Sequence, residues 1–149
     1  MQPLNPEAPL SPDLELAPIG LRLFAFVLDA AIAVVLVLTV GSFAVTSGVS
    51  VGTAAPAMVV VAAAYNIGFV AAAGATPGKT AVGLKVAGRD GLRPSPDAAV
   101  LRFLAYFVLG ALFPFGTIAN LASMFADAQR RTFPDRIAGT VVLRELRAA

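Results

Sequence analysis

The sequence contains 149 residues with a net charge of +2, and 58% of them are hydrophobic while only 13% are charged. Together with a mean hydropathy of +0.81, this composition excludes an ordinary soluble domain and indicates a single domain in a lipid bilayer. The chain has no Cys and no His, which excludes disulfides, thiolate chemistry and the commonest general base. We therefore expect neither an enzyme nor a cofactor or metal centre.

Residues 1–18 hold five of the eleven prolines and three acids, but no Lys or Arg. This composition predicts a disordered cytoplasmic tail. A cleaved signal peptide would need a basic start and a hydrophobic run of about 7–15 residues, whereas the run that follows the tail is about twice as long. We therefore expect the tail to stay attached to a membrane domain over residues 19–143, with residues 144–149 as a second tail.

The first hydrophobic run, residues 21–45, is long enough as a helix to cross a hydrocarbon core of ~30 Å. Its two charged residues, Arg22 and Asp29, are seven positions apart and therefore lie on one helix face. Arg22 is near the helix end and can extend its guanidinium to the lipid headgroups. Asp29 lies roughly 10 Å deeper, where a carboxylate exposed to lipid costs on the order of 3 kcal/mol. Asp29 must therefore face protein, water or a cation.

Three roles for Asp29 follow from this position. It can bind or relay a cation or a proton, as carboxylates inside membranes often do. It can form a structural ion pair with Arg22 or Arg102 that locks the helices together. It can also lie in a lumen or at a subunit interface. The sequence leaves these alternatives open.

A second span is predicted over residues 57–73, after a short uncharged turn rich in Gly, Ser and Thr. It contains Asn66, a polar group in a hydrophobic span that we expect to hydrogen-bond across helices or to complete a cation site with Asp29. Gly68 and Ala72 form a small-xxx-small pair, which favours close packing against another helix.

The polar segment that follows, residues 74–97, is predicted to be folded. Residues 82–86 alternate in polarity and predict a short strand, and Arg89-Asp90-Gly91 is typical of a tight turn. Ser95-Pro96-Asp97 predicts a helix start, as does Thr76-Pro77, because the G-x-x-x-x-G-K-[ST] spacing of a phosphate loop is missing. The Lys and Arg residues of this segment predict a cytoplasmic location, and with two spans before it the N-terminus is cytoplasmic too.

The third hydrophobic region, residues 98–126, contains Arg102 near its start, Asn120, and a proline at position 114 that breaks or kinks the helix. A single kinked span would place the arginine-rich end of the chain outside. A re-entrant pair of half-helices would return it to the cytoplasm, and the charge distribution favours this second topology. Beyond the region, residues 140–143 are strand-like and are candidates to pair with residues 82–86.

Several of these features occur together: Arg22 and Asp29 in the first span, TPGK followed by GLKV, LR at the start of the third region, and DR-x-AGT-VV near the end. In this combination, over roughly residues 20–143, the chain resembles the RDD family, which is named for one arginine and two aspartates. Asp135 matches the second aspartate, although relatives often carry His or Asn where this chain has Pro134. The resemblance implies a small bacterial integral membrane protein, for which transport, including sodium/proton exchange, is the usual suggestion.

The predicted fold class is an all-α integral membrane protein with three hydrophobic helical regions, the third broken or re-entrant, and a small cytoplasmic β element. The leading functional hypothesis is a transport-associated protein of the bacterial plasma membrane that moves a cation, a proton or a small ligand. Its rival is a scaffold or accessory subunit whose charges only lock helix packing. Because three helices enclose little space, transport would require a homo-oligomer or a partner membrane protein, with Na⁺ or H⁺ as candidate ions. The candidate site residues are Arg22, Asp29, Arg102 and Asp135, with Asn66 and Asn120 as secondary candidates.

Overall fold

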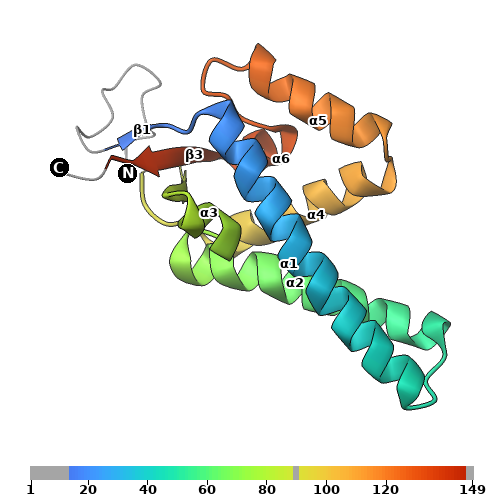
Figure 1. Cartoon of the computed structure of the whole chain (residues 1–149). Helices are drawn as coiled ribbons and strands as arrows, with labels where there is room; N and C mark the ends of the chain where they lie inside the picture. Colours follow the sequence, from blue (N-terminus) through green and yellow to red (C-terminus); the bar gives the residue numbers. More distant parts are fainter. Residues whose placement is uncertain (1–13, 89–90, 147–149) are drawn as a thin grey trace.

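The computed structural model describes residues 14–88 and 91–146, which form a mostly helical structure with one small sheet (Figure 1). In chain order the elements are β1 (Leu14–Leu16), α1 (Ile19–Thr46), α2 (Val51–Ala73), α3 (Pro77–Ala81), β2 (Leu84–Gly88), α4 (Pro96–Ala111), α5 (Phe115–Ala126), α6 (Phe133–Ile137) and β3 (Thr140–Glu145).

Two long helices, α1 and α2, pack against each other as a hairpin whose connecting turn lies at the end far from the sheet (Figure 1). Both are long and apolar enough to cross a membrane. The second span begins earlier than predicted, at Val51, because the Ser50 side chain caps the helix by accepting a hydrogen bond from the Thr53 backbone N–H. Apart from this earlier start, the two predicted spans are confirmed as helices.

One face of α1 is directed into the protein, and the rest of its surface is largely exposed. Arg22, Ala25 and Asp29 are buried, at spacings of three and four residues that lie on one side of a helix. Large apolar side chains such as Val35 and Leu38 are 63% and 62% exposed, as expected of helices that face lipid. The two charged residues of the first span thus point at neighbouring elements.

The three strands form one antiparallel sheet in the order β1-β3-β2. The central strand, β3, places Val142 opposite Val86 and Leu143 opposite Leu16. Val86 and Val142 belong to a core that includes buried residues of α1, α2 and α4, so one face of the sheet is covered by helices. The predicted pairing between the segment near residue 84 and the C-terminal strand is therefore confirmed, with β2 two residues further along the chain than expected.

Strand β1 corrects the prediction that residues 1–18 form a tail. Leu14 and Leu16 pack against a second cluster on the sheet that contains Leu143, and the Ala17 N–H donates to the Val142 carbonyl. The alternating apolar residues in this segment were too few to predict a strand beside so many prolines. Residues 1–13 lie outside the described part of the chain, as does the predicted turn at positions 89–90. At the other end, the tail predicted from residue 144 is still part of β3.

The third hydrophobic region is broken, as predicted, into α4 and α5. Helix α4 begins with the predicted cap, in which the Ser95 side chain accepts from the Ala98 N–H and Pro96 occupies the first turn. At the break, a Cβ on Gly116 would overlap the Leu109 carbonyl, so only glycine lets the two helices approach this closely. Because the chain then continues through α6 into β3, which pairs with β2, both ends of the region lie beside the same sheet.

We predict that Leu143→Ala lowers the free energy of unfolding by about 2–4 kcal/mol, the usual cost of a cavity at a fully buried leucine. Leu143 is 1% exposed between β1 and β2, so its loss should loosen both outer strands. Thermal unfolding in detergent measures the effect, with Leu146→Ala, at a 41% exposed position, as the matched control. Equal unfolding temperatures for the two variants would contradict the sheet packing.

Candidate functional site

The second aspartate of the predicted pair, Asp135, is held by a local capping box. Thr132 precedes α6 and accepts a hydrogen bond on its side chain from the Asp135 N–H, while Asp135 Oδ2 accepts from the Thr132 N–H at 3.1 Å. This reciprocal arrangement fixes the carboxyl group at the start of the helix. Asp135 has no exposed surface, so it requires partners of opposite charge.

Two arginines from distant elements supply that charge. Arg22 of α1 donates to Asp135 Oδ2 and to the Arg130 carbonyl, while Nη1 of Arg102 lies 2.7 Å from Asp135 Oδ1. The latter contact is an ion pair, and Asp135 Oδ1 accepts no hydrogen bond from residues 14–88 and 91–146. Arg102 Nη1 also donates to the Thr140 hydroxyl at 2.7 Å. The three charged groups thereby connect α1, α4, α6 and the start of β3.

The two arginines keep Asp135 ionised. Burial alone would raise the pKa of this carboxyl, but the positive charges of Arg102 and Arg22 and the Thr132 N–H outweigh it and hold the pKa below its ordinary value. A carboxyl with a lowered pKa in the folded state stabilises the fold above its unfolded pKa of about 4. This contribution is complete at neutral pH and is lost as the pH falls below about 4 and through the folded pKa.

The first aspartate, Asp29, is also fully supplied with donors. Its Oδ1 accepts from the Tyr65 hydroxyl at 2.9 Å and from the Gly78 N–H at 2.8 Å, and its Oδ2 accepts from the Thr76 hydroxyl. Lys79 Nζ lies 3.6 Å from Oδ2. The carboxylate therefore joins α1 to α2 and to the start of α3.

Sequence reasoning offered Arg22 or Arg102 as the ion-pair partner of Asp29, and that pairing is wrong. Both arginines pair with Asp135, and the cation beside Asp29 is Lys79. The physical reason is geometric, because α3, which starts at Thr76 and Pro77, packs directly against α1. This packing brings the Gly78 N–H and Lys79 to the Asp29 carboxylate.

Lys79 is a half-buried cation, with its side chain 19% exposed, and its contacts with neighbouring acceptors are few. Its ammonium donates to the Thr76 hydroxyl at 3.1 Å, while its 3.6 Å separation from Asp29 exceeds a hydrogen bond. Burial, followed by the positive charge of Arg102, lowers the pKa of Lys79 to about 8, so the ammonium is still mostly protonated at neutral pH.

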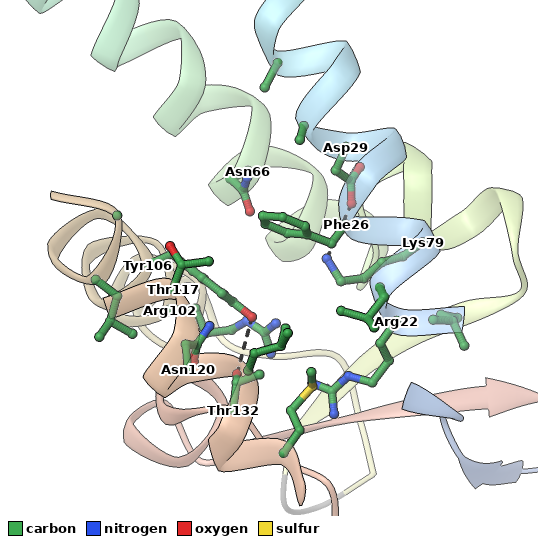
Figure 2. Close-up of a pocket in the computed structure, with 18 residues that line it drawn as sticks. Arg22, Phe26, Asp29, Asn66, Lys79, Arg102, Tyr106, Thr117, Asn120 and Thr132 are labelled. Carbon is green, nitrogen blue, oxygen red and sulfur yellow. Dashed lines mark hydrogen bonds and ion pairs between the residues drawn. The ribbon is translucent and has the colours of Figure 1, made fainter. Parts of the chain in front are cut away.

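A cavity of about 310 Å³ lies between the helices, beside both clusters. Figure 2 shows side chains from α1, α2, α3, α4 and α5 directed toward it. Its polar lining includes Arg22, Asp29, Asn66, Lys79, Arg102, Tyr106, Thr117, Asn120 and Thr132. All the predicted site residues except Asp135 line the cavity, and Asp135 lies behind its wall, bound to two of them. Their use as an ion pathway stays a prediction.

The two asparagines occupy different positions in the cavity wall. Asn120 Oδ1 accepts a hydrogen bond from the Phe133 N–H at 3.2 Å, which joins α5 to α6. Asn66 of α2 lines the cavity, and no other residue in the described ranges 14–88 and 91–146 hydrogen-bonds to its side chain. The expected partner of Asn66 is therefore missing.

Several residues of the site escaped the sequence analysis. Tyr65, Thr76 and Lys79 contact Asp29, and Thr132 positions Asp135. One signal was present: Thr132 and Asp135 have the T-x-x-D spacing of a capping box. The contacts of Tyr65 had no such signal, because they depend on how α2 packs against α1.

The fold and the site define a class of membrane-associated proteins: two long apolar helices, a small sheet at one end, and buried Arg–Asp pairs between them. Comparison with protein families matches the RDD family over residues 16–139, which is most of the chain and contains Arg22, Asp29 and Asp135. The chain belongs to the RDD family. Comparisons with curated proteins and with solved structures give no match.

We predict that Asp135→Asn lowers the free energy of unfolding by about 3–5 kcal/mol, because it leaves Arg22 and Arg102 buried without their counter-charge. Chemical or thermal unfolding in detergent measures the loss. The control is Glu145→Gln, which removes an exposed ion pair with Lys85 and should cost no more than about 1 kcal/mol. A similar small loss in both variants would show that the buried triad contributes little to stability.

We also predict that Gly78→Ala separates α3 from α1. A Cβ at this position would lie 2.7 Å from the Ala25 carbonyl oxygen and from the Asp29 carboxylate, so the backbone has to move, at a cost of about 1–3 kcal/mol. Thermal unfolding measures the loss. Gly68→Ala is the control, since its Cβ would meet nothing within 4 Å and Ala favours a helix. Should both variants unfold at the same temperature, the close approach of the Gly78 backbone to α1 would be contradicted.

Proposed function

We propose that this protein is a transport-associated, multi-pass protein of the bacterial plasma membrane, and that it holds a small ligand in the cavity between its helices without catalysing a reaction. The observation that carries the proposal is the cavity itself. Polar and charged side chains from five helices converge on it (Figure 2), and a charged, partly open space among apolar helices is typical of a solute site.

The arrangement of the sheet supports a topology with the N-terminus in the cytoplasm. Strand β1 comes before α1, β2 comes after α2, and β3 comes after α5, yet the three strands pair in one sheet. These three points of the chain therefore share one side. Lys85 and Arg144 are on this sheet, and the positive-inside rule places such residues in the cytoplasm.

A homo-oligomer or a partner membrane protein would complete a path across the bilayer. Two helices are long enough to span, and the third region is divided into α4 and α5. The tip between them exposes Phe113 and Phe115 by 74% and 79%, which suits contact with lipid or with another membrane helix.

Na⁺ or H⁺ is the alternative cargo, and the geometry favours it less. A bound Na⁺ takes several oxygen ligands such as carboxylates and carbonyls, and a relayed proton has to displace a donor from the carboxylate that accepts it, whereas both oxygens of Asp29 already accept hydrogen bonds. Within the described residues, no three acidic side chains gather as a metal site requires.

The second candidate function is a scaffold or accessory subunit in which the charges only lock the helices. The observation in its favour is that Asp29 and Asp135 are each surrounded by donors from other elements. The two functions differ in the role of the cavity, which a scaffold would leave unused.

Flux in liposomes that contain the purified protein separates the two functions. We expect flux of at least one of Na⁺, H⁺ and inorganic phosphate through the wild type, and a reduction of about tenfold in Asn66→Leu, which fills the cavity with an apolar side chain. Val60→Leu is the control, because Val60 is on the same helix and 65% exposed. Asp29→Asn is measured beside them, after its folding and oligomeric state have been checked.

The outcomes are distinct. Flux lost in Asn66→Leu and kept in Val60→Leu supports a solute site in the cavity. If flux is lost only in a folded Asp29→Asn variant, the Asp29 carboxylate is the group that transport requires, and this outcome would favour cation or proton transport. No flux of these probes in any preparation would contradict a stand-alone transporter of them and leave the scaffold.

A further inference from the structure

The charges around the cavity do not balance. Among the residues that the structure describes, three cations line it, Arg22, Lys79 and Arg102, together with one carboxylate, Asp29. Asp135, behind the wall, compensates a second positive charge through its contacts with both arginines. One positive charge remains in excess beside a partly open, largely apolar space, where electrostatic attraction is stronger than in bulk water.

The unused hydrogen-bonding capacity at the cavity also belongs mainly to donors. Lys79 has three N–H groups, of which one is bonded to Thr76. Asn120 uses its carbonyl oxygen for the Phe133 N–H, so its amide N–H groups are left to face the cavity (Figure 2). By contrast, both oxygens of Asp29 already accept hydrogen bonds. The space is thus set up to receive a group with several acceptor oxygens and a negative charge.

The remaining wall of the cavity is apolar. Phe26, Ala30 and Ala33 continue along α1 from the charged end, and Leu109 and Leu121 face them from α4 and α5. A simple inorganic anion would contact only the charged end. A molecule that fills both parts needs an apolar body attached to an anionic head.

We propose that the cavity binds an anionic amphiphile, with a phosphate or carboxylate head against Lys79 and Arg102 and an apolar chain along Ala30 and Ala33 of α1. This inference rests on the proposed function in taking the cavity as the ligand site, and it names the class of ligand. A volume of about 310 Å³ accommodates a head and the first part of a chain, while the rest of the chain extends toward the exposed apolar surface of the helices.

Two further features support an anion at the charged end. Lys79 remains mostly protonated at neutral pH, since its pKa is lowered only to about 8. An anionic head would also supply the counter-charge that Lys79 obtains only partly from Asp29, at 3.6 Å. Such a ligand would offset the cost of partly burying this cation.

Calorimetric titration of the full chain in maltoside micelles tests the proposal with three probes: dodecyl phosphate, inorganic phosphate and dodecyltrimethylammonium. We expect dodecyl phosphate to bind, and its apparent affinity to fall about tenfold or more in Lys79→Gln, as the loss of a charge-assisted hydrogen bond implies. Lys85→Gln is the matched control, because Lys85 pairs with Glu145 on the sheet, away from the cavity, and we expect a change of about twofold or less.

A second pair of variants tests the apolar end and does not touch the polar clusters. Ala33→Leu fills the cavity wall and should weaken dodecyl phosphate binding, whereas Ala31→Leu, on the exposed side of α1, should leave it unchanged. This pair keeps the proposal falsifiable if Lys79→Gln does not fold.

Each of the other outcomes contradicts one part of the proposal. Inorganic phosphate that binds as tightly as dodecyl phosphate, with no effect of Ala33→Leu, would show a site for a soluble anion and reject the amphiphile. Preference for dodecyltrimethylammonium, or no binding of any probe, would reject the anion. If dodecyl phosphate binds as expected but reconstituted protein moves no solute, the ligand class stands and the transport proposal fails.

Discussion

The ion pairs of Asp135 with Arg22 and Arg102 are the interaction on which the rest of the structure depends. They join elements that are far apart in the chain, because Arg22 begins the first long helix and Asp135 begins the last short one. Two buried guanidinium groups would be very costly alone, and a single buried carboxylate pairs with both of them and compensates one of the two positive charges. Once they meet, the N-terminal half of α4, the start of α6 and the first residue of β3 are brought together.

Asp29 connects α1 to α2 and α3, much as Asp135 connects α1 to α4 and α6. It accepts hydrogen bonds from Tyr65 of α2 and from the start of α3, so α1 is fastened to one set of elements at Arg22 and to another at Asp29. Since the two residues are on one face of α1, about two turns apart, the same helix face organises both clusters. Arg22 and Asp29 therefore line the cavity, while Asp135 lies behind its wall and holds Arg22 and Arg102 in place.

This division has a consequence for what the cavity can bind. The carboxylates are engaged in holding helices, so the interactions that remain open belong to cations and amides, above all Lys79. A site of this kind attracts acceptor-rich, negatively charged groups. In the proposed ligand site the buried charges would contribute to stability and to ligand preference at once, and a change at either aspartate would affect both.

Local sequence was sufficient for the elements whose cause is local. The two long apolar runs, the Ser95-Pro96 helix start and the break before Gly116 could all be predicted from the chain, because hydrophobic length, capping and proline act over a few residues. The strand at Leu14–Leu16 could not, since three residues acquire a strand conformation only by pairing with β3.

The charged residues show the same limit at the site. The sequence by itself determined that Asp29 faces protein, water or a cation, because a carboxylate inside an apolar run must avoid lipid. The burial of Arg22 and Arg102 appeared only in the structure. Only the tertiary structure decided which charges pair. Asp135 meets both arginines and Asp29 meets Lys79, since these pairings depend on how α3 and α6 are placed against α1 by the sheet, and no spacing along the chain encodes that placement.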